Sequence, residues 1–364
     1  MKRTLEDLPE EFFEETLDLM LDKVLAGKSL FAEGLIETRT NFPSFLELTK
    51  EKVFTLMSLS FFGLMKYNFT DLLGNSEYTK CMANYYIRTC KELKKDPEWF
   101  NKILRIERWV LGEDETVPFT KKEPNWSKSD NTVEKVSIDI LNEKKGIEDF
   151  RNAVQVNFAD PYPGGTLPST YGDVVQEEIL FLIYPELFIT CLLVPRIAHR
   201  EAIAVSGLTR TNKYTGYQHR FAFEGDFTED SNPITVLHMD ALPGGERDKQ
   251  SLDRELAKAY LAFSAVKGQT VATGHWGCGA FGGHHQRKFI VQLIAAAEAE
   301  VNLIYTTFGV SRINGAQEFY DHLKENQHKV KRIYKALCNN LGWGSGGGSY
   351  FQTILNEIKL LESE

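Results

Sequence analysis

The stretch 160–187, "DPYPGGTLPSTYGDVVQEEILFLIYPEL", joins a glycine-rich turn to two adjacent glutamates, and an apolar run follows immediately. Acidic residues in the first turn of a helix interact favourably with its dipole, which would by itself explain Gln176-Glu177-Glu178. The preceding Gly164-Gly165 pair favours a second explanation, because glycines let the backbone approach a ligand closely. A loop of this kind before a helix can hold a phosphate or a sugar hydroxyl against N–H groups. Successive helix residues point about 100° apart, so the two glutamates should play different roles.

The composition of the whole chain limits the function classes. It has 364 residues, a hydrophobic fraction of 42% and a formal net charge of -9. This length suits one large domain or two ordinary ones, and the hydrophobic content supports a real core. An acidic chain argues against direct, sequence-independent binding to nucleic acid, which needs a basic face, although a local basic patch is compatible with it.

Cysteine usage and apolar runs indicate the compartment. The five cysteines are scattered and form no CxxC pair, so we expect reduced thiols inside the cell, in the nucleus, the cytoplasm or both. The N-terminal "MKRTLEDLPEEFFEE" lacks the apolar core of a secretion signal. The longest apolar run, 179–194, is interrupted by Pro185 and Glu186, so it is too short and too polar to span a membrane.

The first hundred residues predict helices, because apolar residues recur there at three- and four-residue spacing. Gly27 marks a stop for the first helix, and Asp96-Pro97 is a good start for the last. The predicted helices cover residues 10–27, 44–65, 75–95 and 96–112.

The character of the sequence changes near Gly112, and short β-rich runs then alternate with helical runs. Such alternation predicts an α/β sheet packed on both faces. Residues 344–349, "GSGGGS", are a low-complexity patch, either a mobile loop or an engineered linker. The predicted strands are 133–140, 153–158, 201–207, 233–241, 269–274 and 302–309, and the predicted helices begin near Gln176, Arg254 and Gln286.

A second glycine-rich stretch, 273–300, reads "TGHWGCGAFGGHHQRKFIVQLIAAAEAE". Its glycines fit neither a Walker loop nor a dinucleotide fingerprint, but they suit a strand–loop–helix that wraps a diphosphate with backbone donors. The alternative is a loop crowded against its neighbours. Cys278, His284 and His285 suggest zinc, but a fourth ligand is missing, so we predict no metal.

Two further stretches place aromatic residues beside glycines. In "TNKYTGYQHRF", 211–221, Tyr214 and Tyr217 flank Gly216, and they could stack on a base or equally be core or surface tyrosines. In "YTTFG", 305–309, a strand meets a glycine at the edge where open α/β sheets bind ligands. Phe308 could therefore be a core residue or a pocket wall.

These motifs occur together in a familiar order. A glycine pair before "VVQEEILFLIYPEL", then "YTGY", "VATGHWGCGAFGG" and "YTTFG", resembles the poly(ADP-ribose) glycohydrolase family, and "FTKKE" and "VQVNFAD" extend the match upstream. The best match runs from about Val154 to Gly309. The resemblance implies an α/β fold, a macrodomain-type α/β/α sandwich with a mixed sheet. It implies a helical accessory region at 1–112 before a catalytic domain at 113–364.

The resemblance also implies a function and a set of site residues. The chain would hydrolyse ribose–ribose O-glycosidic bonds of poly(ADP-ribose), with no cofactor, acting as a monomer on the polymer and on poly(ADP-ribosyl)ated proteins and releasing ADP-ribose. Glu178 would be the catalytic acid, and Glu177 would hold ribose hydroxyls. The implied substrate-binding residues are Asp160, Gly164, Gly165, Thr166, Gln176, Tyr214, His275, Gly277, Cys278, Gly279, Ala280, Phe281, Gly282 and Phe308.

The chemistry agrees with one glutamate acting twice. A glycosidic oxygen leaves poorly until it is protonated, and the glutamate left ionised can then activate a water against the oxocarbenium-like sugar. The chain also departs from the family pattern: Thr166 replaces a third glycine, and Asp160 and His275 stand where we expect asparagines. The gap to Gln176 is also about two residues longer than expected. The alternative function is therefore a module that binds ADP-ribose with weak or no hydrolysis.

Overall fold

The structure is a computed structural model that describes residues 8–66, 69–70, 72–167, 173–229, 232–342 and 349–363. In this part of the chain, nine strands form one sheet in the order β1-β2-β6-β9-β5-β10-β11-β4, with β3 paired to β2, and β7 and β8 form a separate hairpin. The strands are β1 Ser44–Thr49, β2 Ile103–Leu111, β3 Thr120–Lys121, β4 Ile138–Leu141, β5 Val154–Ala159, β6 Glu201–Leu208, β7 Asn212–Thr215, β8 Ala222–Asp226, β9 Ile234–Asp240, β10 Thr270–Thr273 and β11 Asn302–Thr306.

Helices occur between and after these strands. A π-helical turn, Phe12–Thr16, leads directly into the first α-helix, and 3-10 turns occupy seven short segments of the described chain. The α-helices are α2 Leu17–Leu30, α3 Lys50–Phe61, α4 Ser76–Lys95, α5 Gln176–Ile183, α6 Phe188–Leu193, α7 Lys249–Ser264, α8 His285–Ala299, α9 Ala316–Glu325, α10 Val330–Asn339 and α11 Tyr350–Ser363. The 3-10 turns are Leu72–Gly74, Trp99–Asn101, Val133–Lys135, Ile147–Asp149, Pro185–Leu187, Gln218–Arg220 and Ser311–Ile313.

The chain divides into two compact units, each made of several segments. Unit 1 comprises Met1–Glu107, Ala159–Ile197 and Ala204–Val236, and unit 2 comprises Arg108–Phe158, Ala198–Ile203 and Leu237–Glu364. Both contain helices and strands. The accessory boundary at residue 112 that the sequence predicts stays a prediction.

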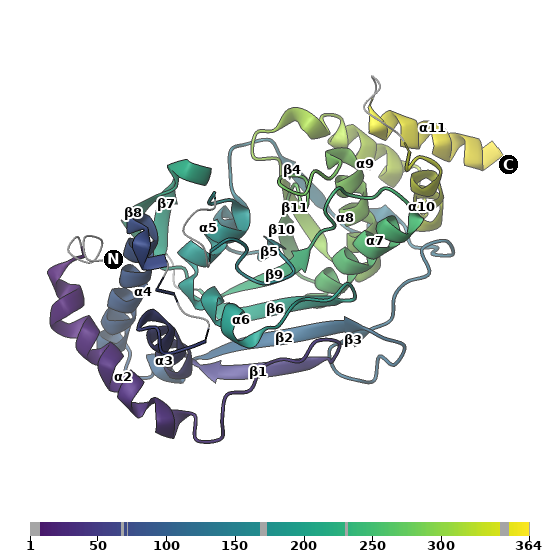
Figure 1. Ribbon diagram of the computed structural model, residues 1–364. Coiled ribbons are helices and arrows are strands. Elements are labelled where there is room, and N and C mark those ends of the chain that lie inside the picture. Colours follow the sequence, from purple (N-terminus) through teal and green to yellow (C-terminus); the bar gives the residue numbers. More distant parts are fainter. Residues whose placement is uncertain are drawn as a thin grey trace. The chain divides into compact units, whose positions relative to one another are not determined.

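In unit 1, helix α4 packs against the β7–β8 hairpin and helix α5 (Figure 1). The helix begins where the Asn75 side chain accepts hydrogen bonds from the amides of Glu77 and Tyr78, at 2.9 and 3.3 Å. Farther along, Arg88 pairs with Asp226 of the hairpin at 2.9 Å. The helix therefore holds the hairpin in place.

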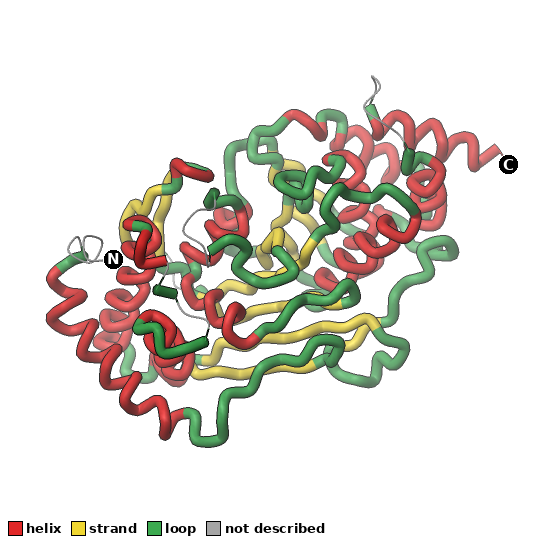
Figure 2. The backbone as a smooth tube through the Cα atoms, in the orientation of Figure 1, coloured by secondary structure: helices red, strands yellow, loops and turns green. Residues whose placement is uncertain are grey.

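In unit 2, β10 pairs in parallel with both β5 and β11, and β11 pairs in parallel with β4. Helices α7 and α8 pack side by side (Figure 1). From Phe289 to Ala297 every residue of α8 is buried, which is typical of a helix inside a fold rather than on its surface. The C-terminal part of the unit, α9 to α11, is helical (Figure 2).

One predicted helix is wrong. Residues 103–111 form strand β2, and only Trp99–Asn101 make a 3-10 turn. Leu104, Ile106 and Arg108 are buried at alternate positions, which is the two-residue period of a strand. A charged residue at an inward position obscures this alternation in the sequence. Arg108 tolerates burial because it pairs with Glu201 at 2.5 Å.

Several predicted boundaries also shift. Helix α3 begins at Lys50, not residue 44, because Ser44–Thr49 is β1 and the Thr49 hydroxyl caps the helix by accepting from Lys52 N at 3.2 Å. Helix α2 continues past Gly27 to Leu30. The strand predicted at 133–140 is confined to Ile138–Leu141. The other predicted strands and helices are confirmed, although α7 begins at Lys249, earlier than expected.

Two further expectations can be compared with the described residues. All five cysteines are free thiols, as the sequence predicts. Among the helices of the described chain, none is long and apolar enough to cross a membrane. The low-complexity patch at 344–349 lies outside the described residues except for Ser349, and so does Pro168–Gly172 of the first glycine-rich segment.

Candidate active site

The two adjacent glutamates of α5 are both buried, with 4% of Glu177 and 3% of Glu178 exposed. The Glu177 carboxylate accepts hydrogen bonds from the amides of Asp160 at 2.8 Å and Gly164 at 3.0 Å. Asp160 also stabilises a turn in this loop, because its Oδ1 accepts a hydrogen bond from the amide of Tyr162 at 2.9 Å. Glu177 therefore shapes the loop that precedes the helix.

Glu178 makes a different set of contacts. Its Oε1 accepts from the amide and the hydroxyl of Thr166, both at 3.0 Å, and its Oε2 accepts from the amide of Val175 at 3.2 Å. The last bond is the one that a glutamate at the third position of a helix makes back to the N-cap. The two carboxylates thus differ in their surroundings, as their angular separation on the helix predicts.

The backbone of the loop lies so close to the two carboxylates and to Cys191 that glycine is required at positions 164 and 165. Gly165 has a φ of +57°, and a Cβ there would lie 2.5 Å from Glu178 Oε1 and 2.9 Å from Glu177 Oε2. Gly164 has a φ of +101°, and a Cβ there would lie 2.8 Å from the sulfur of Cys191. Both positions therefore combine a backbone that favours glycine with a close approach.

The charges of the two glutamates reach three further side chains, of which sequence reasoning missed Tyr78 and Cys191. Burial and the nearby Glu178 charge raise the pKa of Tyr78 to about 12, and the same causes raise the pKa of Tyr217. Burial and Glu177 raise the pKa of the Cys191 thiol, whose sulfur donates to Pro163 O at 3.1 Å. Tyr78 comes from α4, and only its helical spacing distinguishes it in the sequence.

Gln176 and Tyr214 complete the predicted residues of unit 1. Gln176 is the first residue of α5 and is half-buried. The half-buried Tyr214 ring on β7 stacks on Phe221, with ring centroids 5.5 Å apart and an interplanar angle of 14°. This stack makes a flat aromatic surface on the hairpin, which is the shape that a base needs.

The second glycine-rich loop lies in unit 2, between β10 and α8. Several of its amides bond within the loop: Cys278 N donates to His275 O at 3.0 Å, and Gly282 N donates to Gly279 O at 3.0 Å. Gly277 has a φ of +72°, and a Cβ there would lie 2.5 Å from Ala241 Cβ. In the part of the chain that the structure describes, the loop amides of Gly277, Gly279, Ala280 and Phe281 have no protein acceptor.

His275 at the start of this loop is held at both ring nitrogens. Nε2 donates to Thr307 O at 3.1 Å, which leaves Nδ1 to accept from Tyr305 Oη at 3.2 Å. Burial lowers its pKa, so the ring is neutral. His285 packs edge-on against it at 4.7 Å, and burial together with His275 lowers the pKa of His285 to about 4.

Phe308 is placed by the end of β11. It has a φ of +51°, its amide donates to Thr306 Oγ1 at 3.3 Å, and 44% of the residue is exposed. A bulky residue with positive φ is strained, and such strain is often found at binding sites. The exposure favours a pocket wall over a core residue.

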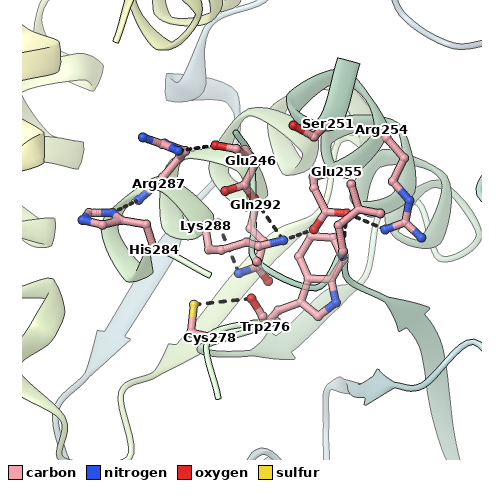
Figure 3. A network of polar contacts seen from close by, with 12 residues as sticks. Glu246, Ser251, Arg254, Glu255, Trp276, Cys278, His284, Arg287, Lys288 and Gln292 are labelled. Carbon is pink, nitrogen blue, oxygen red and sulfur yellow. Dashed lines mark hydrogen bonds and ion pairs between the residues drawn. The ribbon is translucent and has the colours of Figure 1, made fainter. Parts of the chain in front are cut away.

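A buried charge network underlies the glycine loop of unit 2 (Figure 3). Lys288 of α8 is fully buried, pairs with Glu246 at 3.0 Å and with Glu255, and lies 4.0 Å from the centre of the Trp276 ring. A Cβ at Gly277 would lie 3.3 Å from its Nζ. Burial lowers the pKa of Lys288 to about 8, while Glu246 raises it.

The residues that suggest zinc in the sequence have other contacts. Cys278 Sγ donates to Trp276 O at 3.5 Å, and His284 Nδ1 accepts from the amide of Arg287 at 3.3 Å to cap α8. His285 packs on His275. Across the described residues, no group of three or more His, Cys, Asp and Glu side chains could hold a metal ion.

The chain matches a family model described as "Poly (ADP-ribose) glycohydrolase (PARG), Macro domain fold" over residues 123–315, more than half of its length. It belongs to the poly(ADP-ribose) glycohydrolase family. The match confirms the macrodomain-type α/β fold, whose mixed sheet has nine strands among the described residues. It covers both glutamates and the glycine loop of unit 2, whereas Tyr78 lies outside it.

Individual relatives of this glycohydrolase family agree. The chain is 26% identical over 338 residues to "Probable poly(ADP-ribose) glycohydrolase 2" of Arabidopsis thaliana, covering 78% of this chain and 63% of that protein. It is 30% identical over 223 residues to "Poly(ADP-ribose) glycohydrolase 1" of Caenorhabditis elegans, covering 54% of this chain and 28% of that protein. The chain therefore spans less than two thirds of the length of these curated relatives. A solved glycohydrolase from Thermomonospora curvata, bound to the inhibitor ADP-HPD, is 16% identical with a TM-score of 0.35, covering 54% of this chain and 80% of that one.

Proposed function

We propose that this chain hydrolyses the ribose–ribose O-glycosidic bonds of poly(ADP-ribose) and releases ADP-ribose. Its membership of the glycohydrolase family supports this activity. The observation that carries the proposal is the pair of buried carboxylates, Glu177 and Glu178, with Gly165 held so close to both that no side chain fits. A backbone without a side chain at this point lets the loop lie directly against both carboxylates.

Glu178 is the residue that we assign to proton transfer. Its protonated carboxyl donates a proton to the glycosidic oxygen as the C–O bond to the anomeric carbon breaks. The bonding electrons leave with the oxygen, and an oxocarbenium-like sugar forms. The Glu178 carboxylate then takes a proton from a water, whose oxygen attacks the anomeric carbon. This second transfer restores the acid, so one residue serves both steps.

The contacts of Glu178 limit which of its two oxygens can carry the proton during this cycle. A carboxyl that donates to a glycosidic oxygen has one oxygen carrying a proton, and that O–H cannot also accept from an N–H at the same position. Thr166 donates twice to Oε1. We infer that substrate takes over the position of Thr166, or that the proton resides on Oε2, which accepts from Val175 N at 3.2 Å among the described residues.

Glu177 and the loop of unit 2 have supporting roles in this proposal. Both oxygens of Glu177 accept loop amides, and the lone pairs that remain can accept ribose hydroxyls. The amides of Gly277, Gly279, Ala280 and Phe281 can donate to a diphosphate. The Tyr214 and Phe308 rings are suited to the adenine side.

A second function has observations in its favour. Thr166 occupies the third glycine position and covers the Glu178 carboxylate, while Asp160 adds a charge near the phosphates and His275 replaces an amide. A module that binds ADP-ribose and cuts slowly or not at all would tolerate all three changes. The two proposals differ only in turnover.

The test is release of ADP-ribose from purified poly(ADP-ribose). We expect wild type to release it and Glu178→Gln to abolish release while binding ADP-ribose within about tenfold of wild type, because the amide keeps the shape but cannot donate the proton. Wild type that binds without release would establish the binding module. Near wild-type turnover of Glu178→Gln would remove Glu178 from the catalytic role.

Glu177→Gln is the matched variant, because it makes the same chemical change one residue away. It should weaken ADP-ribose binding as well as slow turnover, since the new amide group would face the Asp160 or Gly164 amide as donor against donor. Equal binding by both variants would show that Glu177 does not hold the ribose or its loop.

A separate measurement addresses the ligand alone. Amide exchange at Gly277–Gly283 should slow when ADP-ribose is added, because the ligand would satisfy amides that have no protein acceptor. We expect the same at Gly164–Thr166. No slowing at either loop would exclude ADP-ribose as the ligand. Poly(ADP-ribosyl)ated proteins as partners, a monomeric state and a nuclear or cytoplasmic location remain parts of this proposal.

A further inference from the structure

A groove lined by basic residues lies in unit 2, outside the candidate active site. We call it the basic groove, and its cavity has a volume of about 400 Å³. It lies between the start of α7 and the first turns of α10, and it includes most of the sequence "VKRIYK". The residues that define it are Lys249, Lys329, Lys331, Arg332, Tyr334 and Lys335.

The cations of the basic groove are incompletely neutralised. Lys329 and Lys331 share one carboxylate, Asp130, at 2.9 and 2.8 Å. Arg332 pairs with Glu362 at 2.8 Å, and that carboxylate also lies 3.4 Å from His328. On a chain with a net charge of -9, such a local excess of positive charge needs an explanation.

These ion pairs are also weak enough to exchange. The side chains of Lys329, Lys331 and Arg332 are 49%, 42% and 38% exposed. Exposed pairs contribute little to stability, so an incoming anion can replace the carboxylates at little cost. A polyanion gains further because it releases its own bound counterions when cations replace them.

The floor of the basic groove is fixed. Tyr334 is buried, and its hydroxyl donates to Asp253 Oδ1 of α7 at 2.5 Å. Lys249, the first residue of α7, lies 5.6 Å from the centre of the Tyr334 ring and pairs with Asp253 at 2.6 Å. A part-buried hydrogen bond between Tyr334 and Asp253 thus joins the two helices that form the groove, so the groove is not a chance cluster of flexible side chains.

A short segment connects the basic groove to the glycine loop of the same unit. Gly244 N donates to Phe281 O of that loop at 2.6 Å, and Lys249 follows Gly244 by five residues. Five residues span at most about 18 Å. Arg287 makes a second connection, because its guanidinium donates to Glu246 O at 2.5 Å and to Leu341 O, just beyond α10, at 3.1 Å.

We propose that the basic groove binds diphosphates of a poly(ADP-ribose) strand. These diphosphates belong to ADP-ribose residues of the polymer beyond the one whose diphosphate lies at the glycine loop. The proposal rests on the proposed function, because it takes poly(ADP-ribose) as the substrate. The groove would give long polymers an affinity that ADP-ribose alone does not have. Tyr334 supplies the aromatic floor, and the lysines and Arg332 supply the charge.

The test uses a triple variant, Lys329→Gln, Lys331→Gln and Lys335→Gln, in the Glu178→Gln background so that polymer is not consumed. The matched control is Lys91→Gln, Lys94→Gln and Lys267→Gln, which removes the same charge from exposed lysines, each also paired with a glutamate. Binding of long poly(ADP-ribose) and of ADP-ribose is measured over a range of salt concentrations.

We expect the groove variant to bind long polymer about tenfold more weakly at low salt, with a salt slope smaller by about two, since each lost phosphate contact removes roughly 0.7 from the slope for a single strand. Its affinity for ADP-ribose should stay within twofold of the control. If the groove variant bound long polymer as tightly as the protein with an unchanged groove does, and still bound ADP-ribose, only the proposed role of the basic groove would be overturned. Absence of ADP-ribose binding in every variant would instead overturn the proposed function.

A competing polyanion shows whether the basic groove binds poly(ADP-ribose) or nucleic acid in general. Single-stranded poly(A) RNA carries the same kind of backbone charge without the ribose–ribose linkage and its diphosphates. We expect poly(A) to compete weakly, at more than about tenfold higher phosphate concentration than poly(ADP-ribose) itself. Equal competition, lost equally in the groove variant, would show that the groove is a nucleic-acid site and would overturn the proposal.

Discussion

Thr166 donates two hydrogen bonds to a single carboxylate oxygen of Glu178. Its amide nitrogen and its hydroxyl both lie 3.0 Å from Oε1, and the residue itself is exposed. The residue assigned to proton donation is therefore covered, on one oxygen, by a side chain that stands where the family pattern has glycine. An oxygen that already accepts two hydrogen bonds from Thr166 is not open to substrate, so Thr166 should slow the first step.

Thr166→Gly should raise kcat by about tenfold, because it removes a hydroxyl hydrogen bond that must break before substrate can reach Oε1, and such a bond contributes about 1.5 kcal/mol. Thr166→Val keeps the β-branched shape and removes only the hydroxyl. It should therefore give part of the same gain. The measurement is kcat for release of ADP-ribose by the two variants and wild type. A fall in kcat for both would mean that the hydroxyl holds substrate and does not restrain the acid.

Gly165→Ala should nearly abolish turnover. The new Cβ would lie within 3 Å of both Glu177 and Glu178, at a φ of +57°. Gly268→Ala is the control, because Gly268 also has a positive φ, +81°, but nothing lies within 4 Å of a Cβ there. Both variants should lose about 1 kcal/mol of stability from the backbone conformation, measured by urea unfolding. Loss of activity in the control as well would point to backbone strain rather than crowding.

The sequence predicts helix α5 with its two glutamates and the glycine turn before it, because their signals are local. Glycines before a pair of glutamates and an apolar run are adjacent in the chain, and the structure places Gly165 against both carboxylates. The five strands predicted after residue 150 are likewise short apolar runs bounded by turns, and their positions are confirmed, whereas the sequence does not predict the hairpin strands β7 and β8. These features need no knowledge of distant contacts.

The errors arise where a distant partner decides the structure. Strand β2 resembles a helix in sequence because Arg108 faces inward, and only Glu201, ninety-three residues away, makes that position acceptable. Burial and the Glu178 charge raise the pKa of Tyr78, which belongs to a helix that carries no motif. Lys288 reads as a solvated residue at the start of a helix, but Glu246 and Glu255 allow it to be fully buried. No local pattern encodes these pairings.

Lys288→Met should destabilise the fold by about 3–5 kcal/mol, because it leaves Glu246 and Glu255 buried without their shared partner. The double variant Lys288→Met with Glu246→Gln should recover part of that loss. Lys267→Met removes an exposed lysine that pairs with Glu300 at 2.9 Å, and it should cost less than about 1 kcal/mol. Urea unfolding at neutral pH measures all three. Additive losses in the double variant would show that the two residues do not interact energetically.

Acid should destabilise the protein in part through His285. Burial, with His275 and Arg312, lowers the pKa of His285 from 6.5 to about 4 in the folded state. The unfolded chain therefore binds more protons than the folded chain between these values, so stability falls as the pH falls from about 6.5 through about 4. His285→Gln removes this group, and its unfolding midpoint in urea should decline less steeply across that window. His219→Gln, at an exposed turn, should follow wild type. If the unfolding midpoints of wild type and His285→Gln fell in parallel as the pH is lowered, burial beside His275 and Arg312 would not be keeping His285 neutral in the folded state.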